Sequence, residues 1–415
     1  MELLYPHCCG LDVHKSSITA CVRIQEKSGK PRKVVRRFGA MTADLQALAQ
    51  WLVEQQVTHV AMESTGVYWK PVWNILEGQF TLILANAQHV KNVPGRKTDT
   101  KDSEWLAELL QYGLLSGSFV PPQLIRDLRD LTRSRASLAQ ESSRIASRIQ
   151  KVLEDANIKL ASVASDVLGK SGQAMLAALI AGQNDAEKLA DLACGLLRAK
   201  IPQLRSALEG FTRDHHRFLL ERLFVQWQFV ESETELLDQR LEQIGQTEQP
   251  IAEAVARWDT VPGVDRIAAW GLVAEMGIDM DQFPSAQHAA SWGGVCPGNH
   301  ESGGKRLSGK TRKGNPWLRR ILGQSAWAAA RTKNTYVAAQ FRRLAAKRGR
   351  KRAIVAVGHS LLIIGYHLLR KQCSYQDLGA DYFDRLNAEG LKWYLVKRLE
   401  GLGQKVTLEP RETAA

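Results

Sequence analysis

The first 120 residues alternate short β-type runs with stretches of helical spacing. Residues 8–13 and 18–24 are apolar runs separated by a polar turn, which predicts a β-hairpin. Leu45, Leu48 and Leu52 predict a helix over residues 44–55. Two more strands and two more helices are predicted at residues 57–62, 80–84, 67–76 and 103–112. This alternation predicts a mixed α/β domain.

The middle of the chain carries two long apolar stripes, with successive members three or four residues apart. The first is Leu124, Leu128, Leu131, Leu138, Ile145, Ile149 and Val152, and the second is Leu223, Trp227, Val230, Thr234, Leu237, Leu241 and Ile244. Both lie in charged stretches without Gly or Pro, which predicts a coiled-coil pair. Such stripes serve packing, so we assign them no chemistry. Residues 169–202, between them, form a less regular helical insertion without an assigned role.

From Ile251 onward the sequence predicts a compact helical domain rich in glycine and basic residues. Its longest apolar run, residues 353–369, contains two histidines and is short for a bilayer span, so we interpret it as a buried core helix. Periodicity weakens after about Asp381, which predicts a C-terminal extension with a loose end. The predicted division is therefore 1–120, 121–250, 251–380 and 381–415.

Composition is that of a soluble globular protein, with 44% hydrophobic and 24% charged residues in a chain of 415. The N-terminus shows no signal-peptide pattern. The six cysteines form no CxxC pair and no disulfide-like spacing. We therefore expect a protein of the reducing cytosol, without a membrane partner, whose cysteines lie in the core.

The formal net charge of +13 is unevenly distributed along the chain. Residues 251–415 carry 26 basic and 14 acidic side chains, whereas the two preceding regions are nearly balanced. No acidic residue occurs between Glu301 and Asp377. A basic stretch without acids, broken by glycine and aromatic residues, favours contacts to phosphates. The simpler alternative is a basic surface that only promotes solubility.

Four acidic residues in the N-terminal region form a candidate metal site. Asp12 lies in the first predicted strand, Glu63 ends the third, and Asp99 and Asp102 stand three apart at the start of a predicted helix. An acid in an apolar strand is costly to bury without a counter-charge. Oxygen ligands of this kind favour Mg²⁺ or Mn²⁺, which could polarise a phosphodiester. Taken singly, each acid has a structural explanation, such as a favourable charge at a helix N-terminus.

A glycine-rich segment near residue 304 matches the P-loop expression GxxxxGK[ST] by letters alone. A true P-loop comes directly after a buried strand and opens a helix, and here Pro297 precedes the segment and Pro316 lies shortly after it. We therefore reject ATP binding. Ser302 is the alternative reactive group, since glycines allow a phosphate to approach the backbone. A serine in such a loop is also a common turn residue. Its predicted phosphate-binding neighbours are Gly303, Gly304, Lys305, Arg306, Lys310, Arg312, Lys313, Arg319 and Arg320.

Upstream, Val261-Pro-Gly-Val-Asp-Arg resembles a helix-hairpin-helix, in which backbone N–H groups near Gly263 would meet a DNA phosphate. A Pro-Gly turn between packed helices explains the same segment equally well. The sequence leaves both interpretations open.

These residues together resemble the insertion-sequence transposases of the IS110 family, DEDD transposases described as bridge-RNA-guided serine recombinases. The N-terminal motifs are Leu11-Asp-Val-His-Lys, Met62-Glu-Ser-Thr-Gly-Val-Tyr and Lys97-Thr-Asp-Thr-Lys-Asp. The C-terminal motifs are Val261-Pro-Gly-Val, residues 283–292, Ser302-Gly-Gly-Lys and Arg312-Lys-Gly-Asn-Pro-Trp-Leu-Arg. Two motif sets in the family's order are a specific signal.

The resemblance implies a fold and a mechanism. It implies a RuvC-like ribonuclease-H fold at the N-terminus, a central coiled coil and a helical C-terminal transposase domain. Asp12, Glu63, Asp99 and Asp102 would bind Mg²⁺ beside Ser302, and the serine would form a phosphoserine link with DNA. Donor and target DNA, a structured bridge RNA and further copies of the chain, as a dimer of dimers, are the implied partners. The implied location is the bacterial cytoplasm, at the nucleoid.

The sequence departs from the family pattern at Ser103, where alanine is usual, and at Ala87, where proline is usual. Neither departure removes a reactive group. Two other hypotheses stand beside the recombinase. One is a RuvC-like endonuclease that hydrolyses a DNA junction through the acids alone, and the other is a non-catalytic nucleic-acid-binding protein.

Overall fold

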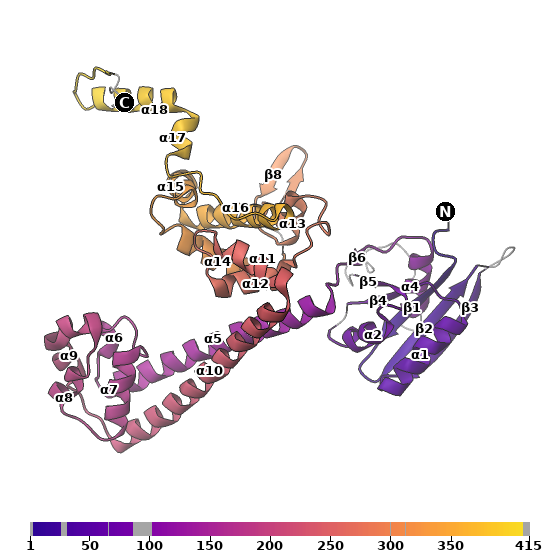
Figure 1. Ribbon diagram of the computed structural model, residues 1–415, viewed down its shortest axis with the longest axis horizontal. Coiled ribbons are helices and arrows are strands. Elements are labelled where there is room, and N and C mark those ends of the chain that lie inside the picture. The colour runs from indigo at the N-terminus through magenta and orange to yellow at the C-terminus, as the bar shows by residue number, and fades with distance from the viewer. Residues whose placement is uncertain are drawn as a thin grey trace. The chain divides into compact units, whose positions relative to one another are not determined.

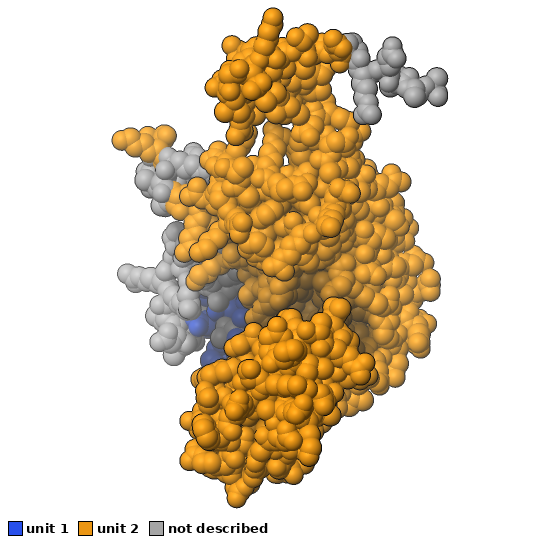
Figure 2. Space-filling view, turned by 90° about the vertical axis from the view of Figure 1, so that its left-hand side faces the viewer, with its two compact units in different colours: residues 1–121 blue, residues 122–415 orange. Residues whose placement is uncertain are grey.

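The computed structural model describes residues 3–25, 31–64, 66–85, 102–298, 300–311 and 313–409. The chain divides into two compact units, Met1–Pro121 and Pro122–Ala415, coloured separately in Figure 2. The first unit is a mixed α/β layer structure and the second is helical, as the sequence predicts. The finer division into four regions stays a prediction.

The first unit is built on a six-stranded sheet in the order β3-β2-β1-β4-β5-β6 (Figure 1). Its strands are β1 (His7–Val13), β2 (Ser17–Ile24), β3 (Arg32–Gly39), β4 (His59–Glu63), β5 (Thr81–Ala85) and β6 (Gly117–Ser118). The first three strands are antiparallel neighbours, β1, β4 and β5 run parallel, and β6 returns antiparallel to β5. The parallel strands therefore end at one common edge.

Helices cover the two faces of this sheet. Successive side chains of a strand point to opposite faces. Cys9 and Leu11 belong to the core formed with α1 (Thr42–Glu54) and α2 (Trp69–Leu76). Cys8 instead belongs with Leu110 of α4 (Asp102–Gln111), and its Sγ lies 3.5 Å from the Ala107 carbonyl oxygen. Gly10 and Asp12, which alternate with Leu11, therefore face α4.

Gly10 lets α4 approach β1 closely. A Cβ at this position would lie 2.3 Å from the Ser103 carbonyl oxygen and 2.4 Å from the Ala107 nitrogen, both backbone atoms of the helix. We expect Gly10→Ala to lower the free energy of unfolding of this unit by about 1–3 kcal/mol, the usual cost of overpacking. Urea unfolding, with hydrogen exchange of the 102–111 peptide as local readout, measures the change.

Gly117→Ala is the matched control in the same unit, because its added Cβ would meet only the Ile83 Cγ2 atom at 3.4 Å. Equal stabilities of the Gly10→Ala and Gly117→Ala proteins would contradict the packing assigned to α4.

The predicted strands and helices of this unit are confirmed within about two residues, and two strands, β3 and the two-residue β6, were missed. β3 lies at the sheet edge, and it carries Lys33, Arg36 and Arg37 among eight residues. Such an edge strand lacks the apolar run of its neighbours, since few of its side chains are buried. Its polar sequence therefore gave no strand signal.

The second unit contains two long helices that pack antiparallel, α5 (Gln123–Asp155) and α10 (Asp214–Thr247) (Figure 1). The direction follows from their contacts, since Arg135 pairs with Asp238 and the Ser142 hydroxyl donates to Glu231 at 2.6 Å. The Trp227 indole N–H donates to the Ser142 oxygen at 3.0 Å. The predicted apolar stripes thus face each other, with polar pairs between them.

The segment predicted as an irregular insertion has a packing role. The chain between α5 and α10, which includes the insertion predicted at residues 169–202, contains α6 (Leu160–Val163), α7 (Lys170–Ile180), α8 (Ala186–Asp191), the 3₁₀ helix η2 (Gly195–Lys200) and α9 (Ile201–Leu208). Leu176, Leu189 and Leu204 form one core with Ile149 of α5 and Trp227 of α10. The segment therefore closes the end of the helical hairpin where α5 ends and α10 begins.

Six further helices form a larger core. They are α11 (Gln249–Asp259), α12 (Arg266–Met276), α13 (Ala286–Trp292), α14 (Pro316–Ala329), α15 (Tyr336–Arg348) and α16 (Arg350–Lys371). Two more helices, α17 (Tyr382–Leu386) and α18 (Ala388–Glu400), follow and contain no buried residue. Within the described ranges, α16 alone has the length and composition of a membrane span. Its apolar side packs in this core, where Gly365 lies against the Trp258 ring. α16 is therefore the buried core helix that the sequence predicted.

The prediction that the cysteines lie in the core was only partly correct. Cys8, Cys9 and Cys21 are buried as expected, but Cys194 and Cys373 are exposed because they lie in loops outside the cores. Burial raises the pKa of the Cys8 thiol to about 12 and that of Cys21 to about 11. Both thiols therefore stay protonated at neutral pH and are not nucleophiles.

Candidate active-site residues

Asp12 and Glu63 lie side by side at the end of two parallel strands. In the register of β1 and β4, Leu11 pairs with Met62, which makes Asp12 and Glu63 the next neighbours. Laterally adjacent residues of a sheet point to the same face. For this pair it is the face covered by α4, since Asp12 alternates with Leu11 on the opposite side. The sheet therefore brings two of the four predicted acids together.

Asp102 opens α4 at the same edge. Cys8 lies beside Ala107 of α4, and Gly10, further along β1, lies beside the earlier helix residue Ser103. The helix α4 therefore runs antiparallel to β1. The first residue of the helix therefore lies toward the Asp12 end of the strand. Asp99, the fourth predicted acid, lies outside the described residues.

The surroundings of these carboxylates favour a cation. The Asp12 side chain is 25% exposed and its Oδ2 lies 3.2 Å from the Nε2 of His14, a side chain 66% exposed. Glu63 is half-buried and forms no ion pair with any residue in the described ranges. Adjacent carboxylates on one face repel each other unless positive charge is placed between them.

The donor chemistry fits Mg²⁺ or Mn²⁺, the predicted cofactors. Carboxylate oxygens are the ligands that these ions prefer, whereas zinc sites use cysteine and histidine. Among the residues that the structure describes, no three His, Cys, Asp or Glu side chains form a complete metal cluster. The acidic tetrad therefore stays a prediction.

Ser302 lies at the tip of a two-stranded hairpin, formed by β7 (His300–Ser302) and β8 (Lys305–Ser308). Ser302 pairs with Lys305, and the turn between them is Gly303-Gly304, with φ of 56° and 73°. Two successive positive φ angles are typical of a type I′ turn, which glycine adopts without strain. The structure thus has a hairpin where the sequence predicted a glycine-rich loop.

The same geometry supports the rejection of a P-loop. The segment from Gly304 to Thr311 is a strand followed by extended chain, and Thr311 pairs with Pro297. A phosphate-binding P-loop would instead enter a helix directly.

The predicted phosphate-binding side chains fall on and beside this hairpin. Lys305, Lys310 and Lys313 are exposed. On α14, one Nη of Arg319 donates to the Thr311 hydroxyl at 3.2 Å, and the guanidinium of Arg320 lies 5.0 Å from the Trp317 ring centre. The backbone of Ser302 and Arg306 is described without their side chains, and Arg312 lies outside the described residues.

Gly263 has a packing reason. Its φ is 84°, and a Cβ there would lie 2.3 Å from the Ala329 nitrogen and 2.5 Å from the Ser325 carbonyl oxygen of α14. The turn between α11 and α12 therefore packs directly on α14, which corresponds to one of the two interpretations left open. A phosphate contact at Gly263 stays a prediction.

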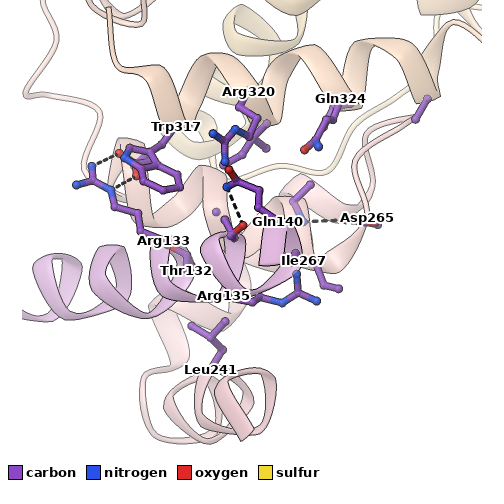
Figure 3. Close-up of a pocket in the computed structure, with 18 of the residues that line it drawn as sticks. Thr132, Arg133, Arg135, Gln140, Leu241, Asp265, Ile267, Trp317, Arg320 and Gln324 are labelled. Atoms are coloured by element: carbon purple, nitrogen blue, oxygen red, sulfur yellow. Dashed lines mark hydrogen bonds and ion pairs between the residues drawn. The ribbon is translucent and has the colours of Figure 1, made fainter. Parts of the chain in front are cut away.

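A surface groove in the second unit was not predicted from the sequence (Figure 3). Its volume is about 1020 Å³, and its walls come from α5, α12 and α14. A smaller hollow of about 400 Å³ shares Ser143 and Arg144 with it and continues along α5. The apolar stripe of α5 predicted a packing role alone. The available signal was Gln140, Arg144, Arg148 and Lys151, which repeat at helical spacing on a face beside the apolar stripe.

Comparisons with known proteins agree on one family. A family model described as a transposase, of the DEDD IS110 type, matches residues 9–158. A second model, described as a transposase of the IS116/IS110/IS902 family, matches residues 256–342. The transposase for insertion sequence element IS1111A from Coxiella burnetii (strain RSA 493 / Nine Mile phase I) is 33% identical over 154 residues. That match covers 34% of this chain and 42% of the relative, so the chain spans less than half of the relative's length.

Proposed function

Because the chain belongs to the IS110 family of insertion-sequence transposases, we propose that it cuts and rejoins DNA strands. The observation that carries the proposal is the pair Asp12 and Glu63, adjacent in register on one face of the sheet within the first matched domain. Two adjacent acids at the end of buried strands serve no packing purpose, and they suit phosphodiester chemistry.

We assign the first unit a RuvC-like ribonuclease-H fold. The mixed sheet, with an antiparallel β1–β3 meander and parallel β4 and β5, supports this assignment. Asp12, Glu63, Asp99 and Asp102 would hold Mg²⁺ or Mn²⁺, which when bound polarises a phosphodiester. His14, whose imidazole lies 3.2 Å from Asp12, orients that carboxylate.

Ser302 is the proposed nucleophile. Its hydroxyl oxygen forms a bond to a DNA phosphorus, the P–O bond to one deoxyribose breaks, and the released sugar oxygen takes a proton. The serine proton goes to water or to a neighbouring base. Attack by another strand's hydroxyl reverses the step, frees Ser302 and joins the strands without an external energy source. The tip of a glycine turn suits this role because it exposes the backbone beside the serine.

The proposed partners are donor and target DNA, a structured bridge RNA and further copies of the chain. The acid-free basic stretch after Glu301, with Lys305, Lys310 and Lys313 exposed beside the hairpin, supports nucleic-acid binding. We propose that α5 and α10 form a coiled coil that joins subunits as a dimer of dimers. Exposed apolar residues at coiled-coil spacing on α10, Phe218, Val225, Phe229 and Leu236, support this role.

The second candidate is a RuvC-like endonuclease that needs only the acids. It is favoured by the same Asp12 and Glu63 pair, and it leaves Ser302 as a turn residue. The two candidates differ in whether cleaved DNA becomes attached to protein.

The proposal is tested by reconstituting strand exchange. The full chain, Mg²⁺, an RNA transcribed from the DNA flanking the gene, and donor and target duplexes are combined. We expect recombinant duplexes that require every component. Cleaved but unjoined DNA would favour the endonuclease, and exchange without the RNA would contradict the guided mechanism.

A further inference from the structure

The groove between α5, α12 and α14 has the size and lining of a site for a polymer. The main hollow is at the upper end of the volume range of small-molecule pockets, and the second hollow extends it along α5. We call this continuous surface the α5 groove. Its α5 wall includes Gln140, Arg144, Arg148 and Lys151, and its α14 wall includes Trp317 and Arg320.

Small side chains leave the space open. Ala136 and Ala139 of α5, Ala268 and Gly271 of α12, and Ala328 of α14 line the groove. A Cβ on Gly271 would lie 2.6 Å from the Ile321 Cδ1 atom, so α12 and α14 are already in contact beneath it. The groove is therefore a built feature between packed helices.

Both acids that line the groove accept hydrogen bonds, and Glu275 is also paired with an arginine. Glu275, 1% exposed, receives two hydrogen bonds from Arg133 at 2.7 and 2.8 Å and one from the Asn315 amide at 2.5 Å. The Asp265 carboxylate caps α12 by accepting from the Ala268 N–H at 2.7 Å. No other acid in the described part of the chain lines either hollow.

Several cations of the groove lack a close pairing like that of Arg133 with Glu275. Arg148 and Lys151 are exposed, and within the described ranges neither forms an ion pair or hydrogen bond. The guanidinium of Arg320 stacks against the Trp317 ring. Arg144 shares its charge with Glu141 at 3.2 Å on the same exposed surface. The groove therefore carries a surplus of positive charge, which favours an anionic ligand.

The spacing of these cations suits a chain of phosphates. Arg144, Arg148 and Lys151 follow one face of α5, and a rise of 1.5 Å per residue places them over roughly 10 Å. Figure 3 shows Arg320 and Gln324 projecting from α14 toward α5, which carries Gln140. Amide and hydroxyl groups beside arginines are typical contacts of a sugar-phosphate backbone.

We propose that the α5 groove binds the phosphodiester backbone of a nucleic acid through Arg144, Arg148, Lys151 and Arg320. This inference rests on the proposed function, which supplies a nucleic acid as substrate or guide. It adds α5 to the basic C-terminal region as a binding surface, although residues 121–250 carry no net positive charge.

The test is the salt dependence of binding by the full chain. The variant Arg148→Gln with Lys151→Gln removes two phosphate contacts and keeps helix propensity. The slope of log K against log salt should fall by about 1.8 for a DNA duplex, or about 1.4 for a single strand. Arg320→Gln should lower the slope by a further ~0.9. Probes are a DNA duplex and a single-stranded RNA, each of arbitrary sequence, and the probe whose slope falls identifies the source of the phosphates.

The matched control is Arg222→Gln with Arg240→Gln, two exposed arginines on α10. It should bind both probes with the slope of the unmodified protein, and equal thermal unfolding of all variants shows that folding is intact. An unchanged slope in the α5 variant, with normal binding by the unmodified protein, overturns only the proposal that the α5 groove binds nucleic acid. Failure of the unmodified protein to bind either probe overturns the proposed function together with the groove.

Discussion

Ser302→Ala is expected to abolish strand exchange, with a loss on the order of 10⁴-fold or more, because no other group supplies the attacking oxygen. Binding of DNA should stay within about two-fold, since the hydroxyl contributes little beside the surrounding lysines. The hairpin should also persist, because the type I′ turn depends on Gly303 and Gly304. Strand exchange measured beside DNA affinity separates the chemical step from binding.

Ser308→Ala provides the control on the same hairpin. Its hydroxyl accepts a hydrogen bond from the Lys310 N–H at 3.1 Å, and it lies at the far end of β8 from the turn. We expect near-normal exchange from this variant. Equal loss in the Ser302→Ala and Ser308→Ala proteins would assign the effect to the hairpin fold, and normal exchange by Ser302→Ala would exclude the serine as nucleophile.

Asp12→Asn and Glu63→Gln are each expected to lower the rate of strand exchange by about 10²–10³-fold, the range for loss of one electrostatic stabiliser. Each change keeps the size of the side chain and removes one negative charge from the sheet edge. Because the remaining acids bind the cation more weakly, half-maximal activity should require more Mg²⁺. The measurement is the exchange rate as a function of Mg²⁺ concentration.

Glu54→Gln is the matched control, since Glu54 is exposed on α1 and contacts Gln50 at 3.3 Å. Its Mg²⁺ dependence should equal that of the unmodified protein. Asp12→Asn and Glu63→Gln proteins with unchanged rates at every Mg²⁺ concentration would contradict the role of these two acids in strand exchange.

The local spacing of apolar residues was sufficient to predict most strands and helices of the first unit. The β1–β2 hairpin and α1 were predicted because their apolar spacing is strong within a short window. β3 was missed because an edge strand with Lys33, Arg36 and Arg37 lacks that pattern. Segment 169–202 could not be interpreted because its leucines pack on Ile149 and Trp227, far away in the chain. Its role depends on contacts that no local window contains.

The sequence likewise predicted part of the candidate site. The order of acids and the Ser-Gly-Gly-Lys motif were visible in the sequence, but the pairing of Asp12 with Glu63 required the register of β1 and β4. A turn signal was also available, since two glycines between short strands favour a type I′ hairpin. The α5 groove was hidden because the cations of α5 are offset by acids elsewhere in residues 121–250. Net charge over a region does not reveal a charged face of one helix.

We expect Ser302 to become covalently attached to DNA during strand exchange. The most direct measurement incubates the full chain with Mg²⁺, guide RNA and DNA, stops the reaction by denaturation, and maps the attached peptide by mass spectrometry. We predict a phosphoserine link at Ser302 that forms in the Ser308→Ala protein and is absent from Ser302→Ala. Complete strand cleavage without an adduct, or an adduct at another residue, would contradict it.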